Sequence, residues 1–220
     1  MLIEIIKYQP KFRKDIINIC FKTGYMGKNV APYFKDPYLF GLLFCLYYVD
    51  YEPENCFIAV ENSQAIGYIL GSLDSKAQDL AFRKLIIPKI MRRLFFNTIW
   101  RHPGTFKTVL HFRKIFSKSP FIPNEREIIQ LYPAHLHIDV LTPFQRIGIG
   151  SNLLKKFEHH LNEQKIEGVH LGTSSFNEKA IQFYYKHNFE LLYQGPLGYG
   201  MWPSTPNARN LIFGKRIKKV

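Results

Sequence analysis

The feature that most constrains the fold of this chain is the alternation of strand-like and helix-like runs between residues 134 and 195. The strand-like run "AHLHIDVL" is followed by the loop "TPFQRIGIG", the amphipathic run "SNLLKKFEHHLNEQK", the strand-like "GVHLGTS", a second amphipathic run "NEKAIQFYYKHN" and "FELLYQG". A last strand is predicted at about 209–216. Because strands and helices that alternate through short loops pack as a sheet covered by helices, this order predicts an α/β fold with helices on both faces.

The residues before position 75 predict further elements of the same unit. A strand is expected at 2–8 and a helix at about 10–23. Asp36 precedes Pro37 as an N-cap precedes the first helical residue, so an apolar helix is predicted from Pro37 to near Asp50. The clearest β-hairpin joins two strand-like runs at residues 61–64. A chain of 220 residues is expected to form a single domain spanning 1–220.

A strongly basic segment at about 75–133 interrupts this order. Its runs "AFRKLIIPKIMRRLFF" and "TVLHFRKIF" mix apolar residues with paired basic ones, as amphipathic helices do. The segment holds twelve Lys and Arg residues against three acidic residues and is interpreted as a helical insertion between strands. Three roles stay open: solvated helix faces, a lid that attracts anionic substrates, or contact with nucleic acid or an anionic membrane surface. No nucleic-acid-binding motif supports a nucleic-acid partner.

Composition limits the class of protein further. Hydrophobic residues make up 46% of the chain and aromatic residues 15%, which is too much for a disordered chain. The three cysteines have no C-x-x-C spacing, so no zinc or redox pair is indicated and a reduced, cytoplasmic location is expected. The most apolar run, 38–49, falls short of the roughly 20 residues that cross a bilayer. The amino terminus lacks the pattern of a secretory leader and is interpreted as the start of the fold.

The loop "QRIGIG", residues 145–150, has the pattern of an anion-binding helix start. Gly148 and Gly150 allow a tight turn that brings backbone N–H groups close to a ligand, and the following helix adds its dipole. Arg146 adds a positive charge and Ser151 a hydroxyl. A dinucleotide fingerprint would need a third glycine where Leu153 stands, and a Walker loop would need Gly-Lys-Ser/Thr. The loop therefore predicts a phosphate-bearing ligand of another kind.

Four consecutive elements resemble one known family. The loop "QRIGIG", the helix "SNLLKKFEHHLNEQ", the strand "GVHLGTS" and the run "NEKAIQFYYKHNFE" are similar to the cofactor-binding half of the GCN5-related N-acetyltransferases (GNAT). That family's loop reads Q/R-x-x-G-x-G/A and its next helix N-x-x-A-x-x-F-Y-x-x-x-G-F. The resemblance covers about 134–194 and implies a GNAT fold with a mixed sheet of about six to seven strands. One departure is Asn188 in place of glycine, and asparagine tolerates the left-handed conformation best after glycine.

The resemblance also implies which residues bind acetyl-CoA, the expected co-substrate. Main-chain groups of Ile138 and Val140 are expected beside the pantetheine arm, and Asn177 is expected to reach the same cofactor. Tyr184 matches the family's tyrosine next to the sulfur, with a buried core aromatic as the alternative reading. Backbone amides of one loop are expected to hold the pyrophosphate: Gln145, Arg146, Ile147, Gly148, Ile149, Gly150 and Ser151.

The strand "HLHID" supplies candidate catalytic side chains. Side chains alternate along a strand, so His135, His137 and Asp139 share one face, and the apolar residues between them can pack under a helix. An alkylammonium, with a pKa of about 10.4, must lose a proton before its nitrogen can attack a thioester. Asp139 is the first candidate base and His137 the second, and hydrogen-bonded structural histidines are the alternative. The strand carries too few ligands for zinc, so no metal is expected.

The resemblance implies an N-acetyltransferase that moves acetyl from acetyl-CoA to an amine by direct attack in a ternary complex, because no cysteine is placed to serve as a covalent carrier. The acceptor, a small molecule or a peptide, and the oligomeric state are not indicated by the sequence. The alternative is a catalytically inactive acetyltransferase-like binding or regulatory module. This alternative arises because the chain also resembles the acetyltransferase-like domain attached to O-GlcNAc hydrolases.

Overall fold

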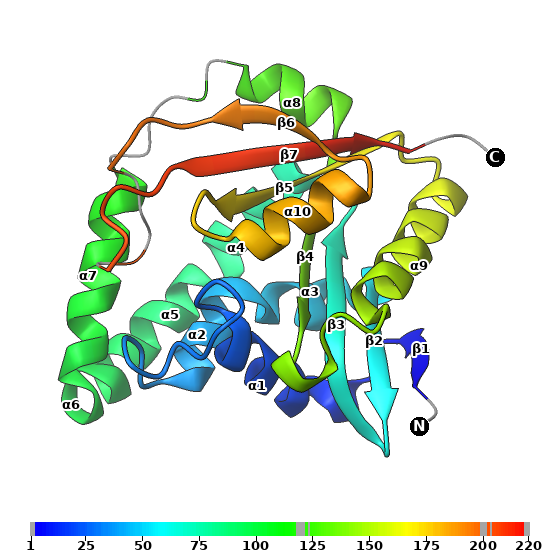
Figure 1. Cartoon of the computed structure of the whole chain (residues 1–220). Helices are drawn as coiled ribbons and strands as arrows, with labels where there is room; N and C mark the ends of the chain where they lie inside the picture. Colours follow the sequence, from blue (N-terminus) through cyan, green and yellow to red (C-terminus); the bar gives the residue numbers. More distant parts are fainter. Residues whose placement is uncertain (1–2, 118–121, 123, 199–201, 203, 218–220) are drawn as a thin grey trace.

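The computed structural model describes residues 3–117, 122, 124–198, 202 and 204–217. Within this part of the chain, seven strands form one mixed sheet in the order β1-β2-β3-β4-β5-β7-β6 (Figure 1). Their bounds are β1 Glu4–Lys7, β2 Cys56–Glu61, β3 Gln64–Ser72, β4 Ala134–Val140, β5 Gly168–Ser174, β6 Glu190–Gln194 and β7 Asn210–Arg216. β4 and β5 are parallel, and the other neighbouring pairs are antiparallel. The mixed sheet of six to seven strands is therefore confirmed.

The helices of the first third follow the predicted pattern with one difference. They are η1 Pro10–Phe12, α1 Arg13–Thr23, α2 Pro37–Phe44, α3 Leu46–Tyr51 and η2 Pro53–Asn55. The Asp36 carboxylate accepts the Leu39 N–H, as an N-cap does. The single helix predicted from Pro37 to near Asp50 is wrong, because the chain leaves the helical conformation at Cys45 (φ −132°). This run is apolar on every side, and after the break α3 packs against β3 while α2 packs against α1.

The β2–β3 hairpin is confirmed, with its turn at the predicted residues. Asn62 and Ser63 have φ values of 47° and 64°, the left-handed pair that a two-residue type I′ turn requires. Asparagine tolerates this conformation better than most residues. The turn therefore matches the right-handed twist of the two strands and fixes their register.

The described residues between β3 and β4 form six helical segments, where the sequence predicted a basic helical insertion. They are α4 Ser75–Leu85, α5 Ile87–Arg93, the π-helical turn η3 Leu94–Thr98, α6 Ile99–Arg101, α7 Pro103–Ser117 and α8 Glu125–Leu131. Pro88 and Pro103 both lie in the first turn of a helix, where a missing N–H costs nothing. None of the helices in the described ranges is long and apolar enough to span a membrane.

Helices cover both faces of the sheet. α1 and α3 pack against β3 on one face, and α9 (Ile149–Glu163) crosses β1–β4 on the other (Figure 1). α10 (Glu178–Lys186) lies on the same face as α9, where the Tyr184 and Phe213 ring centroids are 5.6 Å apart. The short helix η4 (Thr142–Phe144) links β4 to the loop before α9. Leu136 of β4 and Phe157 of α9 belong to the core between these layers, as the strand alternation predicted.

The sheet opens between its two central strands. β4 and β5 pair at only two positions, Ala134 with Val169 and His135 with His170. By contrast, β3 pairs with β4 over six positions, and β5 pairs with β7 over its whole length. Beyond His135 the two central strands therefore separate, and this opening positions the candidate site.

Candidate functional site

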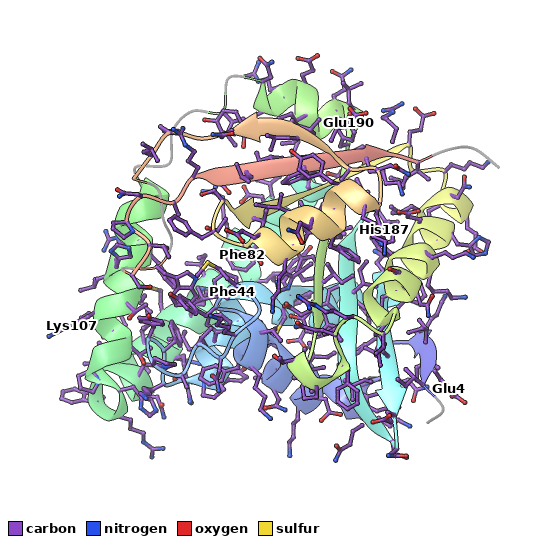
Figure 2. The ribbon with its side chains drawn as sticks, in the orientation of Figure 1. Glu4, Phe44, Phe82, Lys107, His187 and Glu190 are labelled. Carbon is purple, nitrogen blue, oxygen red and sulfur yellow. The ribbon has the colours of Figure 1, made fainter. Side chains whose placement is uncertain are left out.

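A cavity of about 500 Å³ lies where β4 and β5 separate. Its sheet side is formed by residues 137–139 of β4 and 172–174 of β5. Its other walls come mainly from helices α2, α3 and α4. The aromatic residues of these helices that line the cavity are Phe40, Phe44, Tyr47, Tyr48 and Phe82, and Trp202 joins them from a later segment. Figure 2 labels Phe44 on α2 and Phe82 on α4, and both line the cavity. The cavity thus joins polar strand residues to an aromatic wall.

Asp139, His137 and Tyr68 form a polar cluster on the strand side of the cavity. Tyr68 of β3 is directly opposite Asp139 in the ladder, and its hydroxyl donates to Asp139 Oδ2 at 2.8 Å. His137 Nε2 lies 3.5 Å from the same oxygen. Burial raises the pKa of Asp139, although His137 and the Tyr68 hydroxyl act in the opposite direction. The carboxylate is therefore a stronger base than an exposed aspartate.

His135 lies on the same strand face in a structural environment. Its Nδ1 is 2.8 Å from the Tyr48 hydroxyl, and its ring centroid is 5.3 Å from that of His170. Burial, with the neighbouring His170 and His137, lowers the pKa of His135 to about 3. The ring therefore stays neutral near pH 7 and is a weak base.

The backbone of β4 directs hydrogen-bonding groups into the opening. The Leu141 N–H donates to the Ile66 carbonyl at 2.9 Å, which identifies the hydrogen-bonded positions of the β3–β4 ladder. In an antiparallel pair these alternate with positions whose N–H and C=O groups point away from the partner. Ile138 and Val140 occupy such positions, so their groups point toward β5, which pairs with β4 only at 134 and 135. The amides of Ile138 and Val140 are thus presented at the edge of the gap.

The loop at 145–151 has the geometry of an open helix N-terminus. Gly148 is the N-cap of α9 and has a φ of 92°, a left-handed conformation that glycine adopts at little cost. The Asn152 N–H donates to the Gly148 carbonyl at 3.0 Å, so the backbone amides of residues 148–151 precede the first helical bond. No side chain caps them, and the first turn has no acidic residue. These amides and the helix dipole favour an anion.

Two side chains of this loop have partners within the protein. The Gln145 side-chain Nε2–H donates to the Val140 carbonyl at 2.8 Å, which holds the loop against β4. The Ser151 hydroxyl lies 2.9 Å from His187 Nε2 on the neighbouring helix end. Arg146 is exposed and has a left-handed φ of 67°. Backbone amides, rather than the Gln145 and Ser151 side chains, are therefore the groups that this loop presents.

The two glycines of the loop have different roles. A side chain at Gly148 would meet open space, so the left-handed φ alone requires glycine there. A Cβ at Gly150 would lie 3.4 Å from the Phe183 ring, which is ordinary van der Waals contact. Asn188, after α10, has a φ of 60°, which confirms the expected left-handed end of that helix.

Asn177 and Tyr184 reach the cavity from α10. Asn177 is the N-cap residue of α10, and its side-chain N–H group donates to the Thr173 hydroxyl at 3.4 Å. Tyr184 is buried against Phe189 and Phe213. Burial and the nearby Asp139 raise the pKa of Tyr184, so its hydroxyl stays protonated. Tyr184 is thus both a core aromatic and a hydroxyl group at the cavity.

The sequence-predicted residues fall into two groups. His137, Ile138, Asp139, Asn177 and Tyr184 all line the cavity. Val140 and the loop at 145–151, with the exposed Ile147 and the buried Ile149, lie outside that lining, and the loop forms the start of α9. Across the described residues, no three His, Cys, Asp or Glu side chains gather as a metal ion would need.

Several cavity residues were not predicted. Tyr68, Phe44, Phe82 and Arg209 line or support the site from elements far away in the sequence, and no local pattern marks them. Cys20 also lines the cavity, at a position that no sequence pattern indicated. Burial raises the pKa of the Cys20 thiol well above its usual value, so it is a protonated wall residue and a poor nucleophile.

Comparison with known proteins identifies a similar family and similar folds. Residues 122–189 match the model of the acetyltransferase (GNAT) family, and this segment contains β4, the loop, α9, β5 and α10. The crystal structure of SsHAT is similar over 100% of both chains, with 27% identity and a TM-score of 0.75. Ard1 from Thermoplasma volcanium is 16% identical over 100% of both chains, with a TM-score of 0.58. The structure of the NatC complex bound to Gag peptide and CoA matches 99% of this chain and 100% of that chain, at 12% identity and a TM-score of 0.56.

Proposed function

From the premise that this chain has the GNAT fold and carries that family's acetyltransferase segment at 122–189, we propose that it is an acetyl-CoA-dependent N-acetyltransferase. The observation that carries the proposal is the opening between β4 and β5, where free backbone amides and the Asp139 carboxylate meet in one cavity. Acetyl passes to an amine by direct attack in a ternary complex, because the buried Cys20 thiol is unsuited to carry it.

The residues present fit acetyl-CoA, which supplies a reactive thioester when bound. The amides of residues 148–151 would hold its pyrophosphate, and the positive charge of Arg146 adds attraction. The main-chain groups of Ile138 and Val140 would run beside the pantetheine arm, and Asn177 would contact it from α10. The edge amides of β4 also supply donors for negative charge that develops on the acetyl oxygen.

Asp139 acts as the base that removes the proton from the acceptor ammonium. The Tyr68 hydroxyl fixes the orientation of the carboxylate, which would take the proton from the amine directly or through a bridging water. The raised pKa of Asp139 favours proton acceptance. His137, 3.5 Å from Asp139, is the second candidate because it shares the proton path.

Tyr184 assists the departing thiolate as a hydrogen-bond donor. A CoA thiol is expected near the cysteine pKa of about 8.5, while a tyrosine hydroxyl begins near 10. Because burial and Asp139 raise the pKa of Tyr184 further, complete proton transfer to the thiolate is uphill. Its neutral hydroxyl can nevertheless stabilise the thiolate by hydrogen bonding.

The cavity wall favours an acceptor amine with an apolar or aromatic body. Asp139 is the one carboxylate among the described lining residues, and Arg209 contributes a positive charge. Together with a net charge of +13, this lining disfavours polycations such as polyamines and aminoglycosides. Phe44 and Phe82 line the cavity and can contact the part of the acceptor beyond its nitrogen.

The test is turnover of a defined amine panel by the purified full chain with acetyl-CoA. Phenethylamine and tryptamine represent aromatic monoamines, and spermidine and kanamycin represent polycations. Mass spectrometry of the N-acetyl product and release of free thiol should both show acetylation of the aromatic amines, lost in Asp139→Asn. Acetyl-CoA binding without any acetylated amine would instead support a non-catalytic binding module.

A further inference from the structure

Three large aromatic side chains project from one corner of the molecule. Phe95, Phe96 and Trp100, here called the aromatic tip, are 57%, 81% and 79% exposed. They lie on η3 and α6, at the lower left of Figure 1, and Met91 one turn earlier is 45% exposed. Burying such rings in a monomer would normally be favourable, so a contiguous exposed set indicates a binding surface.

The local helix geometry makes the Trp100 ring an apolar projection. Its indole N–H donates to the Phe95 carbonyl of its own helix at 2.9 Å. This bond spans five residues, in the π-helical turn where the regular bonding pattern is interrupted. The indole nitrogen therefore needs no outside acceptor, and the ring can enter an apolar phase without leaving a donor unpaired.

The base of the aromatic tip is fixed to the protein core. Arg93 forms an ion pair with the buried Asp36 at 2.9 Å, and the Thr98 hydroxyl donates to the same carboxylate at 2.7 Å. Leu94 and Thr98, which alternate with the exposed residues, are buried. The tip is thus a rigid wedge whose exposure is built into the helix packing.

The helical segments that carry and flank the tip are rich in basic residues. The helices from 75 to 117 hold ten Lys and Arg residues and one acidic residue, Asp79, which pairs with Arg83. Arg92 and Arg101 are exposed beside the tip. Exposed cations around protruding aromatic rings match the two parts of an anionic bilayer surface, its headgroup charge and its apolar interior.

We propose that the aromatic tip and its flanking basic residues bind an anionic membrane surface peripherally. The rings of Phe96 and Trp100 enter the headgroup boundary, and Arg92 and Arg101 contact lipid phosphates. The sequence carries no nucleic-acid-binding motif, so a membrane surface is the partner that the rings and the cations together fit better. None of the tip residues lines the catalytic cavity, so this surface is independent of the proposed chemistry.

The test uses the full chain and vesicles of phosphatidylcholine alone or mixed with phosphatidylglycerol. Cosedimentation should occur with the anionic vesicles, weaken at high salt, and be at least about tenfold weaker with neutral vesicles. The two tryptophans make fluorescence selective, because Trp202 is 2% exposed and Trp100 is 79% exposed. Anionic vesicles should therefore shift the emission of Trp100 to shorter wavelength.

Matched variants distinguish binding through the aromatic tip from nonspecific adsorption of the protein to vesicles. Phe96→Ser/Trp100→Ser and, separately, Arg92→Glu/Arg101→Glu should each weaken vesicle binding by about tenfold or more. The controls are Phe176→Ser/Tyr185→Ser, whose rings are each 52% exposed, and Lys179→Glu/Lys186→Glu on α10. Circular dichroism verifies that each variant is folded.

Three outcomes would overturn the proposal. The first is equal binding to neutral and anionic vesicles, or none to either. The second is wild-type binding by the folded Phe96→Ser/Trp100→Ser variant. The third is a wild-type dimer that this variant converts to monomer in light scattering, which would assign the tip to a second copy of the chain.

Discussion

The loop at 145–151 and the cavity between β4 and β5 are built in opposite ways. The loop is one continuous run, and the groups that it presents are backbone amides at the start of α9. The cavity is assembled from residues on α1 to α4, the four strands β4 to β7, α10 and the segment near Trp202. A site made by the backbone is determined by local conformation, whereas a site made by side chains depends on how distant elements pack.

The largest expected effect is at the cavity. Asp139→Asn keeps the shape and the hydrogen bond from Tyr68 but removes the base, so kcat should fall by about 10²- to 10⁴-fold. Steady-state kinetics with phenethylamine measures this loss. His137→Asn should cost less, and an equal or larger loss there would move the base to His137.

The loop should respond to backbone conformation and tolerate an added methyl group. Gly148→Ala disfavours the left-handed conformation by about 1–2 kcal/mol, so the free loop relaxes to another conformation and binding must restore the left-handed one, which lowers acetyl-CoA affinity by about 5- to 30-fold. Gly150→Ala should change affinity by less than about twofold, because its Cβ finds ordinary contact with Phe183. Equal losses of acetyl-CoA affinity in the two variants would contradict the claim that the backbone conformation of the loop sets its affinity.

The aromatic wall should control acceptor binding and leave the cofactor unaffected. Phe44→Ala removes a ring from the cavity, so KM for phenethylamine should rise by roughly tenfold while acetyl-CoA affinity is unchanged. Competition between phenethylamine and spermidine, compared in wild type and variant, measures the loss of preference. A variant with an unchanged preference would show that the acceptor does not contact this wall.

The smallest effect concerns acid stability. The folded pKa of His135 is about 3, below the value near 6.5 expected in the unfolded chain, so the unfolded state binds more protons between these pH values. This contribution to stability is complete above about pH 6.5 and is lost toward pH 3. His160, His170 and His187 act in the same direction, whereas the raised pKa of Asp139 acts in the opposite one.

Replacing His135 isolates its contribution to the pH dependence of the free energy of unfolding. Urea unfolding at about pH 7 and pH 5 should show that wild type loses roughly 1–2 kcal/mol more than His135→Gln over this interval. Glutamine retains an acceptor for the Tyr48 hydroxyl and does not titrate. Identical losses in both proteins would show that His135 is not held neutral by the fold.

The same contrast explains what the sequence could predict. The alternation of 134–195 fixed the faces of β4 and the position of the α9 start, because both follow from local period and glycine placement. The type I′ hairpin and the left-handed Asn188 were also local features. These predictions needed no knowledge of long-range packing.

The features that the sequence did not predict depend on packing between distant segments. Tyr68 lies beside Asp139 only because β3 pairs with β4 across the six helical segments between them. The break at Cys45 and the presence of Cys20 in the cavity wall likewise follow from how α1 to α3 cover the sheet. The sequence indicated that the helices before residue 75 are largely apolar. It did not indicate which of their residues meet the strand residues at one site.

The central claim is that the amides at the start of α9 hold acetyl-CoA, and calorimetric titration of Gly148→Asp tests it most directly. The matched control is Gly198→Asp, since Gly198 also has a left-handed φ, 94°, and open space for a side chain. We predict that wild type and Gly198→Asp bind acetyl-CoA and that the carboxylate of Gly148→Asp abolishes binding. No binding by the folded wild type, or full binding by Gly148→Asp, would contradict the account.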